Sequence, residues 1–263
     1  MLFFKEYKST KIKKPNILLC RKKIFASKNK NLLFLLNKRY SWMKKFIKNK
    51  KVVIELGSGT GCINKIIKKK IILTDITKYK WIDEKLDMMK LNLKKKYNKK
   101  VDVFIINHAL HHCANPSLTL YKISKFLKRG GVVLINEPET SFFLKLVQVL
   151  LKDEGWKLDV NIFNKNKNIF KATNPWLSNT AVAQLLFKNE RKFKKYFPQY
   201  KIEKNFLSEF FIFFNSGGLN SVFLHIKLNK FFLKIIDYVD RVLIFFFPSI
   251  FALNRSIVLR KIK

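Results

Sequence analysis

The stretch Val52-Val-Ile-Glu-Leu-Gly-Ser-Gly-Thr-Gly-Cys62 decides the fold of this chain. An apolar run leads into an acidic residue and then into three glycines at alternate positions, which is typical of a strand that turns into a ligand-binding loop. Glycines allow a tight turn and a close approach of the backbone to a ligand, and a helix that follows directs its free amides toward that ligand. The pattern predicts a strand, a nucleotide-cradling loop and a helix beginning at residues 62–69.

The spacing of this loop differs from that of the dinucleotide-binding fingerprint. The loop is G-x-G-x-G, and Cys62 stands where G-x-G-x-x-G requires its third glycine. An acidic residue, Glu55, lies just before the loop. We interpret this combination as a binding loop for S-adenosylmethionine, with Glu55 beside the ammonium group of the cofactor.

Further apolar runs follow in the order that a nucleoside-binding α/β unit requires. Ile71–Asp75 ends in an acidic residue about twenty residues after Glu55, the separation at which a carboxylate meets ribose hydroxyls. We therefore expect Asp75 to hold the ribose. Leu86–Met88 is expected to be a short third strand whose polar residue, Asp87, accepts a hydrogen bond from an adenine amino group.

Two more strands and a helix complete this unit. Val101–Asn107 is β-branched and apolar, and we expect a fourth strand there. Asn115 and Pro116 are typical of a helix start, as cap and first-turn residue, and Gly130-Gly131 is expected to end that helix. Val132–Ile135 is predicted to be the fifth strand.

Residues 50 to 138 resemble the class I methyltransferases of the type-11 kind. The likeness rests on the glycine loop, on Asn107-His-Ala-Leu-His-His112 and on Leu127-Lys-Arg-Gly-Gly-Val-Val-Leu-Ile-Asn-Glu-Pro138. It implies an α/β fold with a seven-stranded Rossmann-like sheet, helices on both faces, and S-adenosylmethionine as cofactor. The residues expected to contact the cofactor are Glu55, Gly57, Gly59, Gly61, Asp75, Asp87, Met88 and Asn107.

The residues after 138 are expected to form a lobe on the substrate side of the sheet. Helices are predicted over Ser141–Lys152 and Thr180–Lys188, and Ser256–Lys263 is expected to be an antiparallel last strand. This region resembles the C-terminal part of uncharacterised methyltransferases of polysaccharide and envelope gene clusters, and Trp176 and Asn179 are its candidate acceptor contacts. We divide the chain into a basic helical segment (1–45), a cofactor-binding core (46–138) and the lobe with the final strands (139–263).

Three of the four histidines lie within Asn107–Cys113, directly after the fourth strand. Four candidate ligands on one short segment cannot readily converge on a tetrahedron, so we expect no metal. Open α/β sheets bind ligands at this edge and histidine titrates near neutral pH, which makes His111 and His112 candidates for a general base. Glu137, at the end of the fifth strand, is a rival base. Pocket lining, helix-start hydrogen bonding and, for Glu137, an ion pair are the alternative roles.

These features predict an S-adenosylmethionine-dependent methyltransferase in which an acceptor oxygen, nitrogen or carbanion attacks the methyl group in line. Positioning and exclusion of water can supply most of the acceleration, so a strong base is optional. The fourth strand lacks the Asn/Asp-Pro-Pro-aromatic signature of nucleic-acid base methylation. The leading acceptor is a small molecule or a lipid-linked saccharide. RNA methylation and a degenerate, non-catalytic binding protein are the alternatives, and the intact loop and Asp75 argue against the second.

The formal net charge of +38 in 263 residues has two interpretations. Such a charge indicates nucleic acid or an anionic membrane as partner, but the lysines accompany abundant Asn, Ile and Phe, as codon bias toward A/T would produce. Residues 1–50 hold sixteen Lys and Arg against the single acid Glu6. Because no regular aromatic interleaving accompanies the lysines, nucleic acid is the less favoured partner, and peripheral contact with an anionic membrane stays open.

Cysteine content and hydropathy give an expected location. The three cysteines, Cys20, Cys62 and Cys113, are odd in number and scattered, which argues for a reducing compartment, the cytoplasm. Leu243–Leu253 is only eleven residues long and is interrupted by Pro248, against about twenty needed to span a bilayer. We therefore expect a cytoplasmic protein, if membrane-associated then only at the surface.

Overall fold

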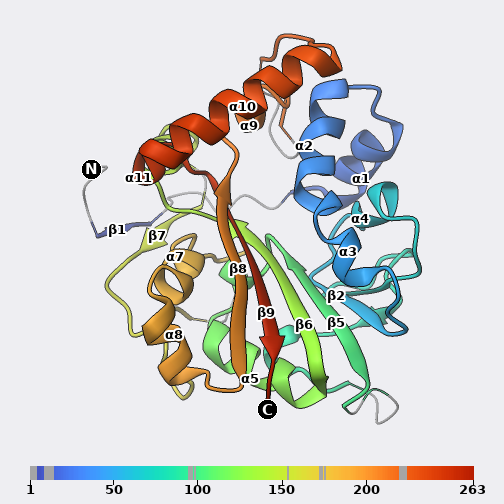
Figure 1. The fold of residues 1–263 in the computed structure, drawn as a ribbon, viewed down its shortest axis with the longest axis vertical. Coiled ribbons are helices and arrows are strands. Elements are labelled where there is room, and N and C mark those ends of the chain that lie inside the picture. The colour runs from blue at the N-terminus through green and yellow to red at the C-terminus, as the bar shows by residue number, and fades with distance from the viewer. Residues whose placement is uncertain are drawn as a thin grey trace.

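A seven-stranded sheet forms the centre of the protein in the computed structural model, which describes residues 5–8, 15–93, 97, 99–152, 154–171, 174, 176–218 and 224–263 (Figure 1). The strand order is β4-β3-β2-β5-β6-β9-β8. The strands are β2 (Val53–Leu56), β3 (Ile72–Asp75), β4 (Glu84–Lys85), β5 (Val101–Asn107), β6 (Leu127–Pro138), β8 (Tyr200–Ser208) and β9 (Asn254–Lys261). The predicted α/β class and seven-stranded sheet are confirmed.

Strand direction divides the sheet into two parts. From β4 to β6 all neighbours are parallel, whereas β9 is antiparallel to both β6 and β8. The last strand is antiparallel, as predicted from the sequence, and it lies between β6 and β8. A separate two-stranded sheet joins β1 (Glu6–Tyr7) to β7 (Trp156–Lys157).

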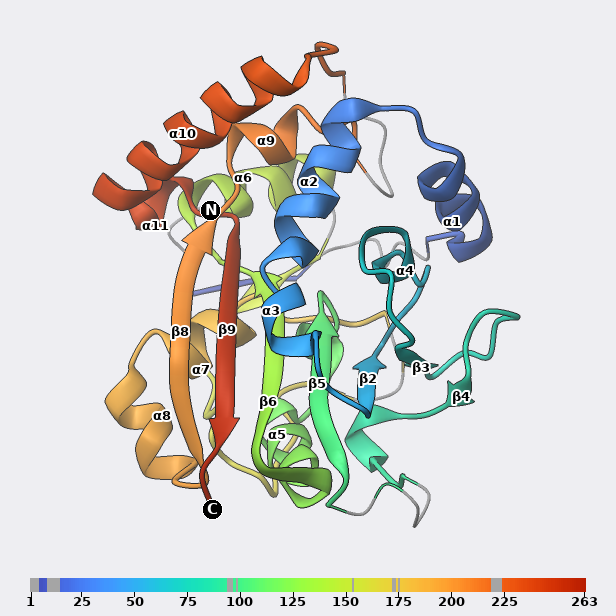
Figure 2. The same cartoon turned by 45° about the vertical axis from the view of Figure 1, so that its right-hand side comes forward.

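Helices cover both faces of the sheet because its strands are apolar on both sides. Ile54 and Phe104 face the cluster formed with α5, α7 and α8, while Val53 and Val103 face α2, α3 and α4. Figure 2 shows α2 and α3 in front of the sheet and α5 behind it. These helices are α1 (Ile17–Ala26), α2 (Lys30–Ser41), α3 (Lys44–Ile47), α4 (Ile63–Ile66), α5 (Pro116–Phe126), α7 (Val182–Phe187) and α8 (Glu190–Tyr196).

A helical lobe lies beyond the end of the sheet where β6 finishes (Figures 1 and 2). It consists of α6 (Phe142–Leu151), α9 (Phe211–Phe214), α10 (Lys230–Phe246) and α11 (Pro248–Phe251). Hydrogen bonds of buried charged side chains hold the lobe together and connect it to α2. Asp240 of α10 accepts hydrogen bonds from the backbone N–H groups of Phe210, Phe211 and Ile212, and Arg39 of α2 binds Glu209 through two nitrogens at 2.9 and 2.7 Å.

Several element boundaries differ from the sequence predictions. The third strand is Glu84–Lys85, and Leu86–Met88 is not a strand. The side chain of Asp87 accepts a hydrogen bond from the Met89 N–H and so begins a 3-10 turn at Met88–Lys90 instead. The fifth strand begins at Leu127, and Gly130, with a φ of +74°, lies inside it next to an irregularity in register.

Two predicted helices also change their starts. The helix after the glycine loop covers only Ile63–Ile66. The helix predicted from Thr180 begins at Val182, with Ala181 as its cap residue. The side chain of Asn179, just before this helix, binds the backbone of Lys157 in β7 and accepts from the Ala181 N–H. Of the lysine-rich loop 94–100, residues 94–96 and 98 lie outside the described residues.

Candidate active site

The glycine loop adopts the conformation for which its glycines were expected. Gly57, Gly59 and Gly61 have φ angles of +70°, +47° and +63°, a region that side chains disfavour. A Cβ atom at Gly57 would lie 2.6 Å from Cβ of Ala109. At Gly59 a Cβ atom would meet no atom within 4 Å. The loop is therefore closely packed at Gly57 and open toward a ligand at Gly59.

Side chains from three other segments hold this loop in place. The Gly59 N–H donates to Oδ2 of Asp75 at 2.8 Å. Its carbonyl accepts from Nε1 of Trp81 at 2.9 Å, and the next carbonyl, of Thr60, accepts from Arg21 at 2.5 Å. No local pattern indicated Arg21 or Trp81, because each reaches the loop only through a tertiary contact.

Glu55 is a buried carboxyl group with an unsatisfied oxygen. Its residue is 2% exposed, and Oε2 has no hydrogen-bond partner among the described residues. Burial raises the pKa of Glu55 to about 8. A cationic ligand group beside Oε2 would stabilise the ionised form. This orphaned oxygen and the open space at Gly59 both fit a ligand that carries an ammonium group.

A cavity of about 1230 Å³ connects the glycine loop to the lobe. The residues lining it include seven of the eight expected cofactor contacts: Glu55, Gly57, Gly59, Asp75, Asp87, Met88 and Asn107. Gly61 does not line the cavity, because a Cβ atom there would meet Arg21, Trp81 and Leu73. Its place is in the packing beneath the loop.

Polar partners already hold several of these side chains. The Asn107 amide donates to the hydroxyl of Tyr40 at 2.8 Å, and its oxygen accepts from Asn136 at 3.0 Å. Tyr40, on α2, is buried and also lines the cavity. The basic N-terminal segment thus supplies part of the cavity wall, which its composition did not indicate.

His111 and Glu137 form a fully buried pair. His111 donates from Nδ1 to Oε2 of Glu137 at 2.5 Å, and Glu137 also accepts from the backbone N–H groups of Ala109 and Leu110 at 2.8 and 2.7 Å. Glu137 does not line the cavity. Its oxygens are used to hold the Ala109–His111 turn, so the geometry does not support the prediction of a rival base.

A second carboxylate, Glu154, faces the cavity side of the histidines. It lies 3.3 Å from Nε2 of His111 and 3.4 Å from Nε2 of His112. Although burial favours a neutral ring, Glu154 and Glu137 raise the pKa of His111 to about 10. Burial and His111 lower the pKa of His112, whose Nδ1 donates to the Leu177 carbonyl at 3.1 Å.

Glu154 is a candidate metal ligand from another part of the chain, which the sequence-based expectation of no metal did not include. Glu154 joins His111 and His112 in a group whose ligand atoms lie within 4.8 Å of one another. The carboxylate follows α6, more than forty residues from the histidines. Nothing in its local sequence singles it out.

His108 is a cavity residue that sequence reasoning passed over. Its backbone has a φ of +50°. Burial and the nearby Arg39 lower the pKa of His108 well below its usual value. Its Nε2 atom has no hydrogen-bond partner among the described residues. Strained backbone at the end of a strand and an unpaired buried nitrogen are features of functional sites. Its signal was only its place beside the favoured pair.

The candidate acceptor contacts both line the cavity but differ in their freedom to bind a ligand. Trp176 is half-buried. Asn179 is buried. Its side-chain oxygen accepts from the Lys157 N–H, and its side-chain nitrogen donates to the Lys157 carbonyl, each at 2.9 Å. Trp176 stays a predicted acceptor contact, whereas the bonds of Asn179 indicate that it positions β7 against the His111 turn.

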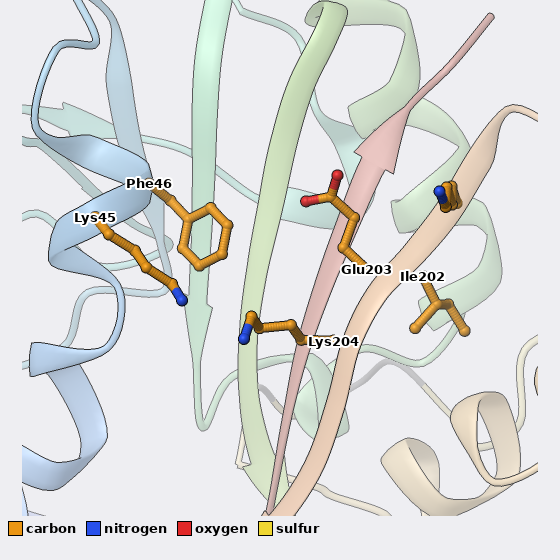
Figure 3. Close-up of a pocket in the computed structure, with 6 residues that line it drawn as sticks. Lys45, Phe46, Ile202, Glu203 and Lys204 are labelled. Atoms are coloured by element: carbon orange, nitrogen blue, oxygen red, sulfur yellow. The ribbon is translucent and has the colours of Figure 1, made fainter.

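A second, more open depression of about 560 Å³ lies between α3 and β8 (Figure 3). Lys45 and Phe46 of α3 point toward Glu203 and Lys204 of β8 across it. Glu203 is paired with Arg260. This depression shares no residue with the glycine-loop cavity, so we place the site in the larger cavity.

Comparison with known proteins agrees with this geometry. A family model described as a methyltransferase domain matches residues 22–196. A SAM-dependent methyltransferase from Archaeoglobus fulgidus has a similar structure, with a TM-score of 0.52 and 16% identity over 94% of this chain and 100% of the other. A Bacillus halodurans protein assigned as a methyltransferase gives a TM-score of 0.43 and 12% identity over 85% and 98% of the two chains. No curated protein sequence matches.

The family match extends over more than half of the chain, from α1 to α8, and includes the glycine loop, Asp75 and the histidine turn. The structural likeness adds the fold: a seven-stranded sheet of mixed direction with helices on both faces. The predicted cofactor is confirmed with the family. The chain belongs to the methyltransferase-domain family and is a class I S-adenosylmethionine-dependent methyltransferase.

Proposed function

We propose that this methyltransferase acts on a small molecule or on the saccharide of a lipid-linked acceptor. The observation that carries the proposal is the volume of the cavity. Its volume of about 1230 Å³ exceeds the roughly 300–1,000 Å³ of ordinary small-molecule sites, so it has room for a cofactor and a compact acceptor together. Trp176 and Phe170 line the cavity and offer flat apolar surfaces on which a ring can stack.

The residues of the chain position the reactants and exclude water. S-adenosylmethionine, when bound, supplies an electrophilic methyl group on a sulfonium sulfur. Glu55 would neutralise the cofactor's ammonium group, Asp75 would hold the ribose, and Asp87 and Met88 would flank the adenine. Holding two reactants in a dry site accounts for a large part of the acceleration in such transfers.

A histidine base is not the role that we propose for His111. Its pKa of about 10 keeps the ring protonated near neutral pH, and carboxylates lie beside both of its nitrogens. A protonated imidazole can orient an acceptor but cannot remove its proton. His112, with its lowered pKa, is the neutral ring of the pair.

An exposed apolar ridge on α10 supports a membrane-associated acceptor. Exposed side chains recur at helical spacing along the outer side of α10, while Leu233, Asp240 and Ile244 face inward. Lys234 and Arg241 are exposed beside them. We define the α10 ridge as Phe231, Ile235, Tyr238, Val242, Phe245, Phe246 and the cap residue Phe247. Among the described residues, no helix is long and apolar enough to cross a membrane.

Such a ridge fits the interface of an anionic bilayer. Aromatic side chains enter the headgroup region while basic residues contact anionic lipids. Sedimentation with vesicles tests this contact. The protein should sediment with acidic-lipid vesicles at low salt, and the double variant Phe245→Asp, Phe246→Asp should not. A matched variant, Phe25→Asp, changes an exposed phenylalanine outside the ridge and should bind as wild type. Equal binding of both variants would remove the ridge from the proposal.

The acceptor class is tested by following the methyl group. Purified enzyme and methyl-labelled S-adenosylmethionine are incubated with an extract, which is then divided into lipid, RNA and small-molecule fractions. Label in the lipid or small-molecule fraction is expected. Label that ribonuclease releases would instead identify RNA as the acceptor, an outcome that the +38 charge would then explain. Cofactor binding without labelling of any fraction would favour a non-catalytic binding protein.

A further inference from the structure

Three side chains that line the cavity bring metal-ligating atoms together. We call the part of the cavity formed by these side chains the acceptor end. The atoms are Nε2 of His111, Nε2 of His112 and Oε1 of Glu154, and the two nitrogens lie 3.3 and 3.4 Å from the oxygen. Ligands about 2.0–2.1 Å from a tetrahedral ion are roughly 3.3–3.4 Å from one another. Both nitrogen–oxygen distances match the edge of a zinc tetrahedron, and all three candidate ligand atoms lie within 4.8 Å of one another.

The other nitrogen of each ring is fixed as metal-binding histidines require. Nδ1 of His111 contacts Oε2 of Glu137 at 2.5 Å, and Nδ1 of His112 donates to the Leu177 carbonyl at 3.1 Å. In metal sites the non-ligating ring nitrogen usually donates to a carboxylate or a carbonyl, which sets the tautomer and turns Nε2 toward the ion. Both rings have this arrangement, and neither partner belongs to the Glu154 segment.

Without a metal ion, no protonation state gives favourable partners to both Nε2 atoms and to the Glu154 carboxylate. With its Nδ1 hydrogen used by Leu177, a neutral His112 ring presents a lone pair on Nε2 to an oxygen of Glu154. Charging both rings would place two cations with centroids 4.2 Å apart. A divalent cation that displaces the Nε2 proton of His111 to solvent uses the Nε2 lone pairs of both rings and neutralises the Glu154 carboxylate.

We propose that His111, His112 and Glu154 bind one divalent cation of the Zn²⁺ type. Two imidazoles and a carboxylate suit this ion, and three protein ligands with one open position are the arrangement of catalytic zinc sites. All three residues line the cavity, so the open position faces the acceptor.

The chemical role of the ion rests on the proposed methyl transfer, here to an oxygen. An acceptor hydroxyl in the open position loses its proton to solvent water more readily when it is bound to the metal. The oxygen then forms a bond to the methyl carbon as the carbon–sulfur bond breaks, and the sulfonium becomes a neutral thioether.

Co²⁺ titration of the untagged, full-length protein tests the site without cofactor or acceptor. We expect one Co²⁺ per chain, with the intense visible bands of a four-coordinate ion and no thiolate charge-transfer band, and displacement by Zn²⁺. His112→Ala and Glu154→Gln should weaken binding by more than the roughly 10- to 100-fold that loss of an outer partner costs. His225→Ala removes a histidine outside the group and should bind as wild type. Circular dichroism checks that each variant is folded.

Two outcomes would overturn the proposal. Equal Co²⁺ binding by wild type and both ligand variants would assign the ion to another part of the chain. No binding at micromolar free Co²⁺ would show that the three residues form an ion-paired cluster only. Because the measurement uses metal alone, its failure is separate from a failure to bind S-adenosylmethionine or to transfer methyl groups.

Discussion

The two ends of the cavity are built in different ways. At the cofactor end, the glycine loop and Asp75 come from consecutive strand ends, and short-range backbone geometry shapes them. At the acceptor end, His111 meets Glu137 from the next strand and Glu154 from beyond α6. The first end is a local motif, whereas the second is assembled from segments that only the complete fold brings together.

This difference teaches where local sequence determines chemistry. The positive φ at Gly59 favours glycine, and this preference depends only on the local backbone of the loop. The state of His111 depends instead on two carboxylates that are remote in sequence, which raise its pKa to about 10. The cofactor end should therefore fail through single local changes, and the acceptor end through loss of partners.

Gly59→Arg should break the cofactor end most severely. A Cβ atom at Gly59 points into open space, so the arginine would occupy the cofactor's place. We expect calorimetry to detect no binding of S-adenosylmethionine. Gly130→Arg is the matched control, because Gly130 also has a positive φ and open space at its Cβ position but lies away from the cavity. Similar affinities in the two variants would contradict the loop assignment.

His111→Ala should cost the acceptor end about 3–5 kcal/mol of unfolding free energy, because it leaves the buried Glu137 without its charged partner. The pKa of His111 is raised in the folded state, so this stabilisation is present in full below about pH 6.5 and is lost as the pH rises through 10.

Urea unfolding of the metal-free protein at pH 6, 8 and 10, with a chelator and without cofactor, measures this effect. The difference between wild type and His111→Ala should shrink as the pH rises. His225→Ala, the same change outside the carboxylate cluster, should show no such trend. A constant difference across the range would mean that His111 is not the charged partner of these carboxylates.

Asp75→Ala should weaken cofactor binding by about 1–3 kcal/mol, the value of a lost hydrogen bond to a charged group. Asp83→Ala is the control. The Asp83 carboxylate also accepts a hydrogen bond from a backbone N–H group, that of Leu73, but Asp83 does not line the cavity. Equal calorimetric affinities in the two variants would move the ribose contact elsewhere.

The smallest expected effect is the pH dependence contributed by Glu55. Its pKa of about 8 means that the ionised form, which pairs with an ammonium group, is lost as the pH falls through 8. Affinity should fall by up to about tenfold per pH unit below that value. Glu55→Gln should lack this slope, and the ratio of the two affinities cancels the ligand's own titration. Parallel pH profiles would exclude Glu55 as the ammonium partner.

The sequence predicted the fold to a large extent because β3 and β5 are short, mainly apolar runs that end in a polar residue, and β2 leads directly into the glycine loop. It also predicted β9, whose apolar residues alternate between the two buried faces. Errors occurred where side chains redirect the backbone, as Asp87 does, or where a glycine lies within a strand, as Gly130 does.

The candidate site was predicted unevenly for the same reason. The cofactor residues are contiguous with strands, so seven of the eight expected ones line the cavity. Glu154, Arg21 and Trp81 act through tertiary contacts, which no local pattern indicates. The proposed change in the role of His111, from base to charged ring or metal ligand, follows from partners that lie 26 and 43 positions away.

The central position of β9 has a consequence for how the chain reaches its native state. β6 pairs with β9 across more than a hundred intervening residues, and β8 joins the sheet only through β9. Until residues 254–261 are available, the apolar strand β6 has an open edge on which another chain can pair. Long-range pairings of this kind slow folding. A newly made chain therefore passes through a stage in which the cofactor half is nearly formed yet prone to aggregate, and chaperones that shield strand edges should increase its yield most at that stage.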